Sequence, residues 1–185
     1  TTVGTTTTSR RRSLLASPTP LPTLEPTLNS YPNCTFDDGT LCAFANVGLY
    51  DWTSGTETPT PNTGPQDGDH TTGSSNFLYV ESSSPNNPTV GPFTLESHPF
   101  RQGEATQVGF YYHMYGTHMG TLEVDAFDDA TASWSTKWSL SGDQGQEWNY
   151  AQCVLEATVT KIRFRGTTGS SYRGDMAIDD VIVST

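Results

Sequence analysis

Short segments in which apolar and polar residues alternate recur from Cys34 to the end of the chain. In the clearest one, residues 121–127, Leu122, Val124 and Ala126 share one face. A period of two is typical of a strand with one buried face. The same pattern predicts further strands over residues 77–81, 108–114, 137–140, 149–155, 158–165 and 176–183. The last segment is apolar on both faces, as expected of a central strand.

Clusters of Gly, Asn, Asp, Ser and Pro separate these segments and predict loops over residues 50–75 and 82–93. No segment of ten or more residues has a helical period. With about ten possible strands and no long helix, the pattern predicts an all-β antiparallel sandwich or barrel.

The first part of the chain has a different composition. Residues 1–32 are mostly Thr, Ser and Pro, and the prolines favour an extended backbone without ladder hydrogen bonds. Thr and Ser clustered beside Pro are typical of an O-glycosylated stalk, although a plain linker has the same composition. We therefore expect a disordered or extended stalk over residues 1–32 and one β domain over residues 33–185.

Charge narrows the set of partners. Residues 34–185 hold six basic and nineteen acidic residues, a net charge of −13. A body this acidic repels nucleic acid and anionic lipid, and it attracts basic partners or divalent cations. No apolar run reaches the roughly 20 residues that span a bilayer, so we expect no membrane insertion by this segment. The chain begins with polar residues rather than a signal peptide, which indicates a piece of a longer protein.

The cysteines and one asparagine point to an oxidising compartment. Cys34 and Cys42 lie eight positions apart, a spacing that suits a disulfide closing a small loop. A zinc site would need a second pair of ligands at matching spacing. Asn33 begins the sequon Asn33-Cys34-Thr35, which is a candidate for glycosylation. These features favour an extracellular location.

Five blocks in a fixed order resemble the MAM domain, a module named for meprin, a neuronal antigen and a receptor tyrosine phosphatase. Their most characteristic parts are Cys34-Thr35-Phe36-Asp37, Asp51-Trp52-Thr53 with Gly68-Asp69-His70-Thr71, Phe110-Tyr111-Tyr112-His113-Met114, Ser141-Gly142-Asp143, and Gly174-Asp175-Met176-Ala177-Ile178-Asp179-Asp180. The resemblance covers about residues 33–184. It implies a two-sheet jelly roll, an extracellular module within a larger chain, a role in adhesion or protein association, and no catalytic activity.

The chain departs from this family in its cysteines. The family usually has two disulfides, but here no Cys stands near Gln107 or after Val181, so the second bridge is missing. Cys153 matches no family cysteine and shares a face with Ala151 and Leu155. It is either a buried free thiol or the site of an intermolecular disulfide.

Four aspartates are candidate ligands of a structural cation. Asp37 follows the first strand, Asp69 lies in a long loop, and Asp179 and Asp180 lie on the closing strand. The first and last strands of a jelly roll are commonly neighbours, so these side chains can meet. Carboxylate oxygens suit Ca²⁺, and the resemblance agrees, because some MAM domains hold a structural cation between these segments.

Strict alternation places Asp179 and Asp180 on opposite faces unless a bulge intervenes. Asp180 shares a face with Met176 and Ile178, so we expect it to be the buried ligand. The alternative is that Asp37 and Asp69 cap turns and Asp180 accepts backbone hydrogen bonds.

The aromatic and histidine residues also allow two interpretations. His70 can hydrogen-bond an aspartate or be buried beside Trp52. Tyr111, Tyr112 and Tyr115 can form a stacking platform for sugars, or they can be core and rim residues.

The sequence predicts a non-catalytic extracellular recognition module for adhesion or protein–protein assembly, including self-association, within a larger cell-surface or secreted protein. It contains neither Gly-x-Ser-x-Gly nor His-Glu-x-x-His, so a hydrolase is not expected. The alternative is a carbohydrate-binding jelly roll with glycan partners. Loops 54–76 and 82–104 are candidate binding surfaces, since loops on a rigid scaffold commonly carry recognition.

Overall fold

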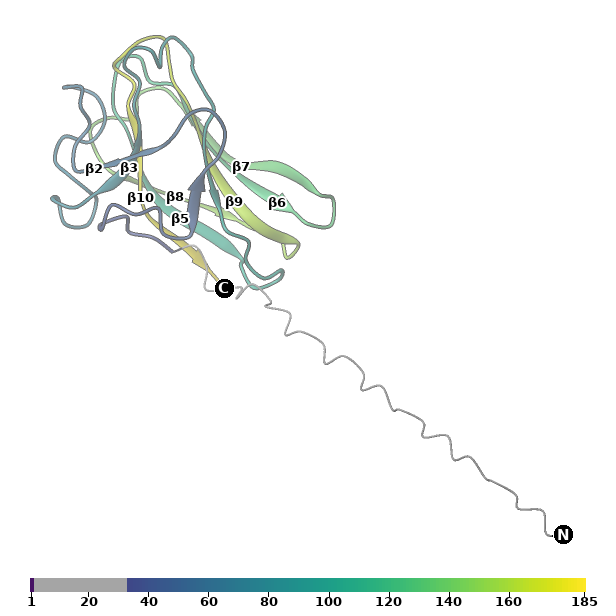
Figure 1. Cartoon of the computed structure of the whole chain (residues 1–185). Coiled ribbons are helices and arrows are strands. Elements are labelled where there is room, and N and C mark those ends of the chain that lie inside the picture. The colour runs from purple at the N-terminus through teal and green to yellow at the C-terminus, as the bar shows by residue number, and fades with distance from the viewer. Residues whose placement is uncertain (2–32) are drawn as a thin grey trace.

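The structure is a computed structural model that describes Thr1 and residues 33–185. The predicted stalk over residues 1–32 lies outside the described residues, except for Thr1. The described residues form ten strands in two sheets (Figure 1). They include no helix with the length and apolar character that crossing a membrane requires.

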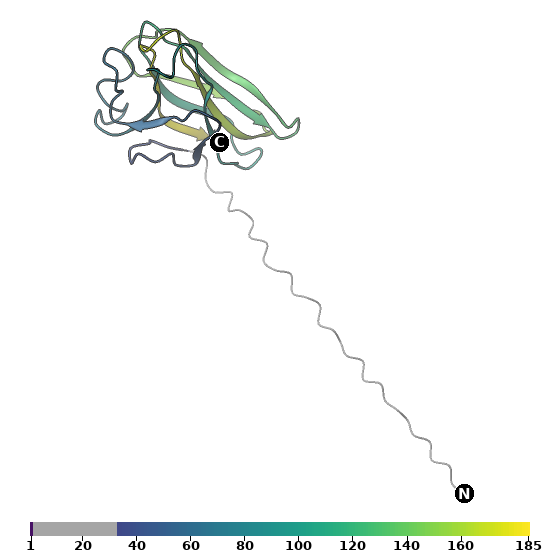
Figure 2. The ribbon, with the colours of Figure 1, turned by 45° about the horizontal axis from the view of Figure 1, so that its top comes forward.

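Each sheet has five antiparallel strands. The first sheet has the spatial order β1 (Phe44–Asn46), β4 (Phe93–Ser97), β9 (Val159–Thr167), β6 (Thr121–Asp128) and β7 (Ser133–Ser141). The second has the order β2 (Thr53–Gly55), β3 (Phe77–Val80), β10 (Met176–Ser184), β5 (Gln107–Met114) and β8 (Asn149–Val154). The sheets lie face to face (Figure 2), which confirms the predicted antiparallel jelly-roll sandwich.

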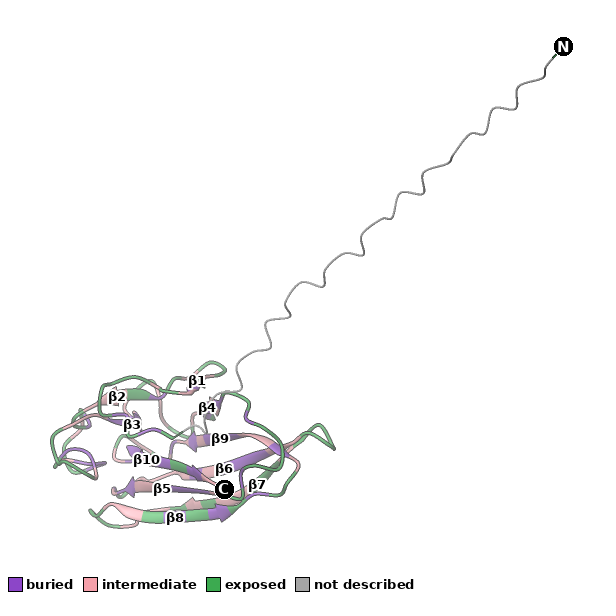
Figure 3. Ribbon diagram, turned by 90° about the horizontal axis from the view of Figure 1, so that it is seen from below, coloured by how far each residue is buried: buried purple, intermediate pink, exposed green. Residues whose placement is uncertain are grey.

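The inward faces of both sheets supply one core. The predicted face of β6 is fully buried, and Phe164 on β9 packs edge-on against Phe110 on β5 with ring centres 5.1 Å apart. Trp52 is 2% exposed and its Nε1 donates to the carbonyl of Phe93 at 2.9 Å. Figure 3 colours the ribbon by burial and shows buried positions on strands of the sandwich. Alternation therefore places the apolar side chains where the two sheets meet.

The predicted strands agree with β3, β5, β6, β8, β9 and β10, and β10 is central as expected. Two loop predictions were wrong in part, because residues 50–75 contain β2 and residues 82–104 contain β4. β2 has only three residues, and its pairing with β3 defines it. β4 directly follows Pro92, and it is held between β1 and β9. In both cases a neighbouring strand decides the structure more than the local pattern does.

Candidate functional site

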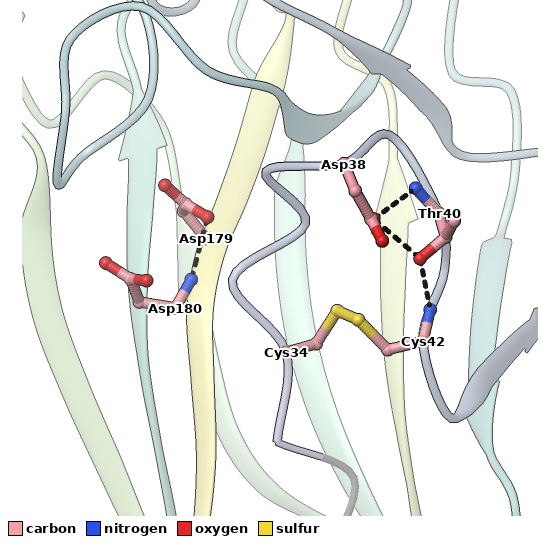
Figure 4. The surroundings of a disulfide bond; sticks show 6 residues. All are labelled: Cys34, Asp38, Thr40, Cys42, Asp179 and Asp180. Carbon is pink, nitrogen blue, oxygen red and sulfur yellow. Dashed lines mark hydrogen bonds between the residues drawn. A yellow bond between two sulfur atoms is a disulfide. The ribbon is translucent and has the colours of Figure 1, made fainter.

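The predicted disulfide between Cys34 and Cys42 is present. The loop that it closes is fastened to β10, because Cys34 and Val181 exchange two backbone hydrogen bonds at 2.9 and 2.8 Å. Inside the loop, Asp38 accepts the backbone N–H of Thr40 at 2.9 Å and its hydroxyl at 2.7 Å. Because Cys34 pairs with Val181, the loop lies beside Asp179 and Asp180 (Figure 4).

A bulge in β10 sets the directions of these two aspartates. The pairing of β10 with β5 shifts register between Asp179 and Ile182, and Asp180 has a left-handed φ of 47°. A bulge breaks the alternation of faces. Asp179 is consequently 1% exposed, whereas the Asp180 side chain is 13% exposed. The expectation that Asp180 is the more buried carboxylate was wrong for this reason.

Asp69 organises the loop that faces β10. It is 3% exposed, and it accepts four backbone N–H groups and one hydroxyl at 2.6 to 3.1 Å. The donors are Thr71, Thr72, Ser74 and Ser75. Burial raises the pKa of Asp69, but these hydrogen bonds outweigh it and hold the pKa well below its usual value. Asp69 thus caps a turn, as the alternative to metal binding predicted.

His70 connects this loop to both aspartates of β10. Its backbone N–H donates to Asp179 Oδ2 at 2.9 Å, and its Nδ1 lies 2.8 Å from Asp180 Oδ2. The imidazole stacks on Tyr111 with ring centres 3.4 Å apart, and the Thr71 hydroxyl donates to Asp180. Of the two interpretations of His70, the structure therefore contains the hydrogen bond to an aspartate.

Three of the four predicted calcium ligands lie close together. Burial raises the pKa of Asp179 to about 7, and the negative charges of Asp180 and Asp69 raise it as well. Asp37 is exposed, and its backbone carbonyl accepts Asn76 Nδ2 at 2.9 Å. Within the described residues, no three His, Cys, Asp or Glu side chains are arranged to hold a metal ion. The calcium site therefore stays a prediction.

The same loop covers part of the outer face of the second sheet. Phe77, Tyr79 and Ala177 are buried there against Trp148, whose Nε1 donates to the carbonyl of Gly68 at 3.2 Å. Gly68 has a φ of +86°, and a Cβ at this position would lie 2.4 Å from the backbone of Gly73. Only glycine fits this turn, so the local sequence fixes how the loop folds onto the sheet.

The tyrosines suggested as a sugar platform do not share one face. Tyr112 packs against the core and lies 5.2 Å from Trp138 between ring centres. Tyr111 points to the outer face, where it contacts His70 and Tyr150. The outer face therefore combines Tyr111 with Tyr150, a residue that our sequence analysis did not single out.

Two further predicted residues lie near the strand ends. Cys153 is a free, buried thiol, and burial raises its pKa to about 11. Asn33 is exposed and its Oδ1 accepts the backbone N–H of Val183 at 2.7 Å. Whether Asn33 is glycosylated, and whether Cys153 forms an intermolecular bond, stay predictions.

The outer face beyond the loop is open and partly apolar. Tyr150 and Val154 on β8 are 53% and 75% exposed, and Ile182 on β10 is 51% exposed. A groove of about 310 Å³ lies beside Ile182 and is also lined by the Cys34–Cys42 disulfide. Alternation along β8 already points Tyr150 and Val154 away from the core, so the sequence contained the signal for this surface.

Known proteins resemble this chain in sequence over most of its length. The family model described as MAM domain, meprin/A5/mu, matches residues 34–185. MAM domain-containing glycosylphosphatidylinositol anchor protein 1 of Gallus gallus is 35% identical, over 80% of this chain and 16% of its own length. MAM domain-containing protein 2 of Mus musculus is 36% identical, over 80% of this chain and 22% of its own length. The chain thus spans about a fifth of the length of these relatives.

Solved structures share the fold at low sequence identity. The K3 cleaved adhesin domain of Lys-gingipain from Porphyromonas gingivalis superposes with a TM-score of 0.61 at 15% identity, over 83% of this chain and 98% of that one. A carbohydrate-binding module specific for non-crystalline cellulose gives a TM-score of 0.51 at 14% identity, over 82% of this chain and 92% of that one. At such identities the likeness concerns the fold alone.

Proposed function

The chain belongs to the MAM domain family, and from this we propose that it is a non-catalytic module that binds protein partners in adhesion or assembly. The observation that carries the proposal is the match of the family model to residues 34–185. In this proposal the module acts within a larger cell-surface or secreted protein, since it spans about a fifth of its relatives.

The module is extracellular. Several of the relatives that it matches are named glycosylphosphatidylinositol anchor proteins, a class attached to the outer cell surface. The Cys34–Cys42 disulfide agrees with this location, because disulfides persist in oxidising compartments.

The state of the reactive side chains supports binding rather than catalysis. Cys153 is buried and its pKa is raised to about 11, the opposite of an activated thiol. Burial lowers the pKa of His113 to about 4, and its ring packs edge-on against Trp148. His70 is held by Asp180 and by stacking on Tyr111. These groups hold the fold together, which is the role expected of them in a recognition module.

Binding of the labelled chain to cells tests the proposal. We expect saturable binding that is lost after protease treatment of the cells and retained after glycosidase treatment. The heat-unfolded chain is the control for specific recognition. Absence of saturable binding to any cell type that expresses cell-surface adhesion proteins would contradict the proposal.

The second candidate function is carbohydrate binding. It is supported by Tyr150, an exposed aromatic residue beside Tyr111 on the open outer face, where a sugar ring can stack. In this case glycosidase treatment removes binding, and Tyr150→Ala weakens binding to the isolated glycan. If Tyr150→Ala binds the glycan as the native chain does, the outer face is not a sugar site.

A further inference from the structure

Among the residues that the structure describes, β8 is an edge strand of the second sheet and pairs only with β5. Edge strands usually carry charged residues, proline or a bulge, which prevent pairing with other chains. β8 reads Asn-Tyr-Ala-Gln-Cys-Val, so it contains no charge and no proline, and its register with β5 is continuous. Tyr150, Gln152 and Val154 are exposed along it, and Figure 3 shows this exposed strand at the border of the sheet.

The hydrogen-bond pattern determines which backbone groups of β8 are free. In the pair that continues the β5–β8 ladder, Leu155 N–H donates to the carbonyl of Thr106 at 2.8 Å. Hydrogen-bonded and non-hydrogen-bonded pairs alternate along an antiparallel ladder. Ala151 and Cys153 therefore bond to β5. The N–H and C=O groups of Tyr150, Gln152 and Val154 point away from β5, three donors and three acceptors at the open edge.

We propose that β8 pairs antiparallel with β8 of a second copy of this chain, centred on Gln152. The inference names a partner for the proposed recognition function and rests on it. In this register Gln152 lies opposite Gln152 of the second copy, and Tyr150 lies opposite Val154 of the second copy. All three donors and all three acceptors on each strand are then paired. Sliding by two residues leaves an outward residue of each strand without a partner.

The side chains are complementary in the same register. Tyr150 and Val154 lie on the outer face, and an aromatic residue opposite a β-branched residue is a favourable cross-strand pair. Two such pairs flank the central glutamines, because the arrangement has two-fold symmetry. On the inner face Cys153 lies opposite Ala151 of the second copy, so the native thiols do not meet. Tyr150 and Val154, which are 53% and 75% exposed in one copy, become covered.

Charge favours this edge for contact between two copies. Residues 34–185 carry a net charge of −13, so two copies repel each other at long range. β8 itself has no charge, so this edge avoids the direct contact of acidic side chains that other parts of the surface would bring. Lys137, the basic residue at one end, is already paired with Glu156 at 2.6 Å, so the ends of β8 add no net attraction. Salt that screens the net repulsion is therefore expected to strengthen association.

The interface is small, so the association is expected to be weak for isolated copies. One strand pair with its outer side chains falls below the roughly 1,200 Å² that stable interfaces bury. Many copies on one surface compensate for weak single contacts by avidity. Self-pairing through β8 thus suits a module that acts where its copies are concentrated.

Sedimentation equilibrium of the chain, with Gln152→Pro as the main variant, tests the proposal. Proline removes the outward N–H of residue 152 without removing a bond to β5, so the fold tolerates it. We expect the native chain to show a concentration-dependent dimer that strengthens between about 20 and 200 mM salt. Gln152→Pro should reduce association at least about tenfold with an unchanged thermal midpoint, and Gln152→Thr should dimerise normally. A monomeric native chain at millimolar concentration, or a Gln152→Pro variant that dimerises fully, overturns the proposal.

Cross-linking tests the register. Directly opposed residues have Cα atoms about 5.5 Å apart, within the range of a disulfide. In a Cys153→Ala background, Gln152→Cys should give a covalent dimer on mild oxidation, whereas Ser139→Cys on the edge strand β7 should not. Equal cross-linking of the two variants overturns the proposed pairing. If the native chain binds cells saturably but stays monomeric, only this inference fails and the proposed function stands.

Discussion

Asp175 is a residue whose buried charge works against the fold. It is fully buried, and its Oδ1 accepts the backbone N–H of Ser82 at 2.8 Å and the Ser82 hydroxyl at 2.7 Å. Its Oδ2 has no partner among the described residues. Burial raises the pKa of Asp175 to about 6, and the negative charge of Glu81 acts in the same direction. The protonated form therefore suits the folded state better than the ionised form does.

This pKa predicts how stability depends on pH. A carboxyl group with a raised pKa in the folded state stabilises the fold fully below its unfolded pKa of 3.8, and this contribution is lost as the pH rises through about 6. Asp175→Asn keeps the acceptor for Ser82 and removes the charge. We expect its free energy of unfolding to exceed that of the native chain by roughly 1–3 kcal/mol at pH 7.5, and not at pH 4.

Urea unfolding at pH 4, 5.5 and 7.5 measures this difference. Asp51→Asn is the matched control, since Asp51 is exposed and its substitution should leave the pH dependence unchanged. Parallel curves for the native chain and Asp175→Asn contradict the assignment of this titration to Asp175.

Residue identity alone could not separate Asp179 from Asp180. Strict alternation gave Asp180 the buried position, but the bulge and the left-handed backbone of Asp180 reversed the order. The bulge lies where β10 pairs with β5 and where Val181 pairs with Cys34, contacts that join distant parts of the sequence. Local pattern carries no record of such contacts, so the finer geometry of the site could not be predicted.

Among the elements, most strands of four or more residues were predictable, including β3, whereas the three-residue strands β1 and β2 were not. β6 and β9 have eight and nine residues, and each alternates over most of its length between the core and the outer face. β2 has three residues, and its hydrogen bonds to β3 define it. Periodicity needs several residues to rise above chance, and a strand of three residues offers none.

The Cys34–Cys42 loop is an element whose contribution to stability can be measured. Its disulfide has a sequence separation of eight, and it fixes the segment that bonds to Val181 on β10. Constraining a loop of this size in the unfolded chain contributes roughly 2–3 kcal/mol. We expect Cys34→Ala/Cys42→Ala to lower the free energy of unfolding by about this amount in urea.

The oxidised and the reduced native chain are the two controls with which the free energy of unfolding of the double variant is compared. Reduction should reproduce most of the loss, because it breaks the bond and leaves the side chains in place. If the double variant and the native chain unfold at the same urea concentration, the loop is held by its backbone contacts alone.

At the scale of the molecule, the fold class, the disulfide and the family could be predicted from the sequence. Five blocks in a fixed order were sufficient, because each block belongs to a buried strand or a tight turn. The binding surface could not be predicted from the sequence, because exposed positions such as Val154 and Ile182 can hold many residue types without affecting the fold. Alternation along β8 indicates that Tyr150 and Val154 point outward, but only the sheet order shows that β8 lies at an edge.

Calcium is the remaining prediction at this scale, since the ion would tie a loop to the last strand. Asp69, Asp179 and Asp180 bring three negative charges together, and the pKa of Asp179 is raised to about 7, with burial as the largest cause and both other charges contributing. A divalent cation offsets such repulsion. Binding at 100 times Kd adds about 2.7 kcal/mol to the free energy of unfolding, so the thermal midpoint should fall by roughly 5–10 °C in chelator.

Adding calcium back should restore the thermal midpoint of the native chain that chelator lowers. The thermal midpoint of Asp179→Asn should respond neither to chelator nor to calcium. Asp129→Ala, in an exposed turn, is the control that should behave as the native chain does. If chelator leaves the midpoint unchanged and elemental analysis finds no ion, the carboxylates have a different role. Asp69 is then held by the turn that it caps, Asp180 by His70, and Asp179 carries the proton that its raised pKa allows. In that case the loop is fastened to β10 by hydrogen bonds alone, and the part of the folding stability that depends on the protonated form of Asp179 should be lost as the pH rises through about 7.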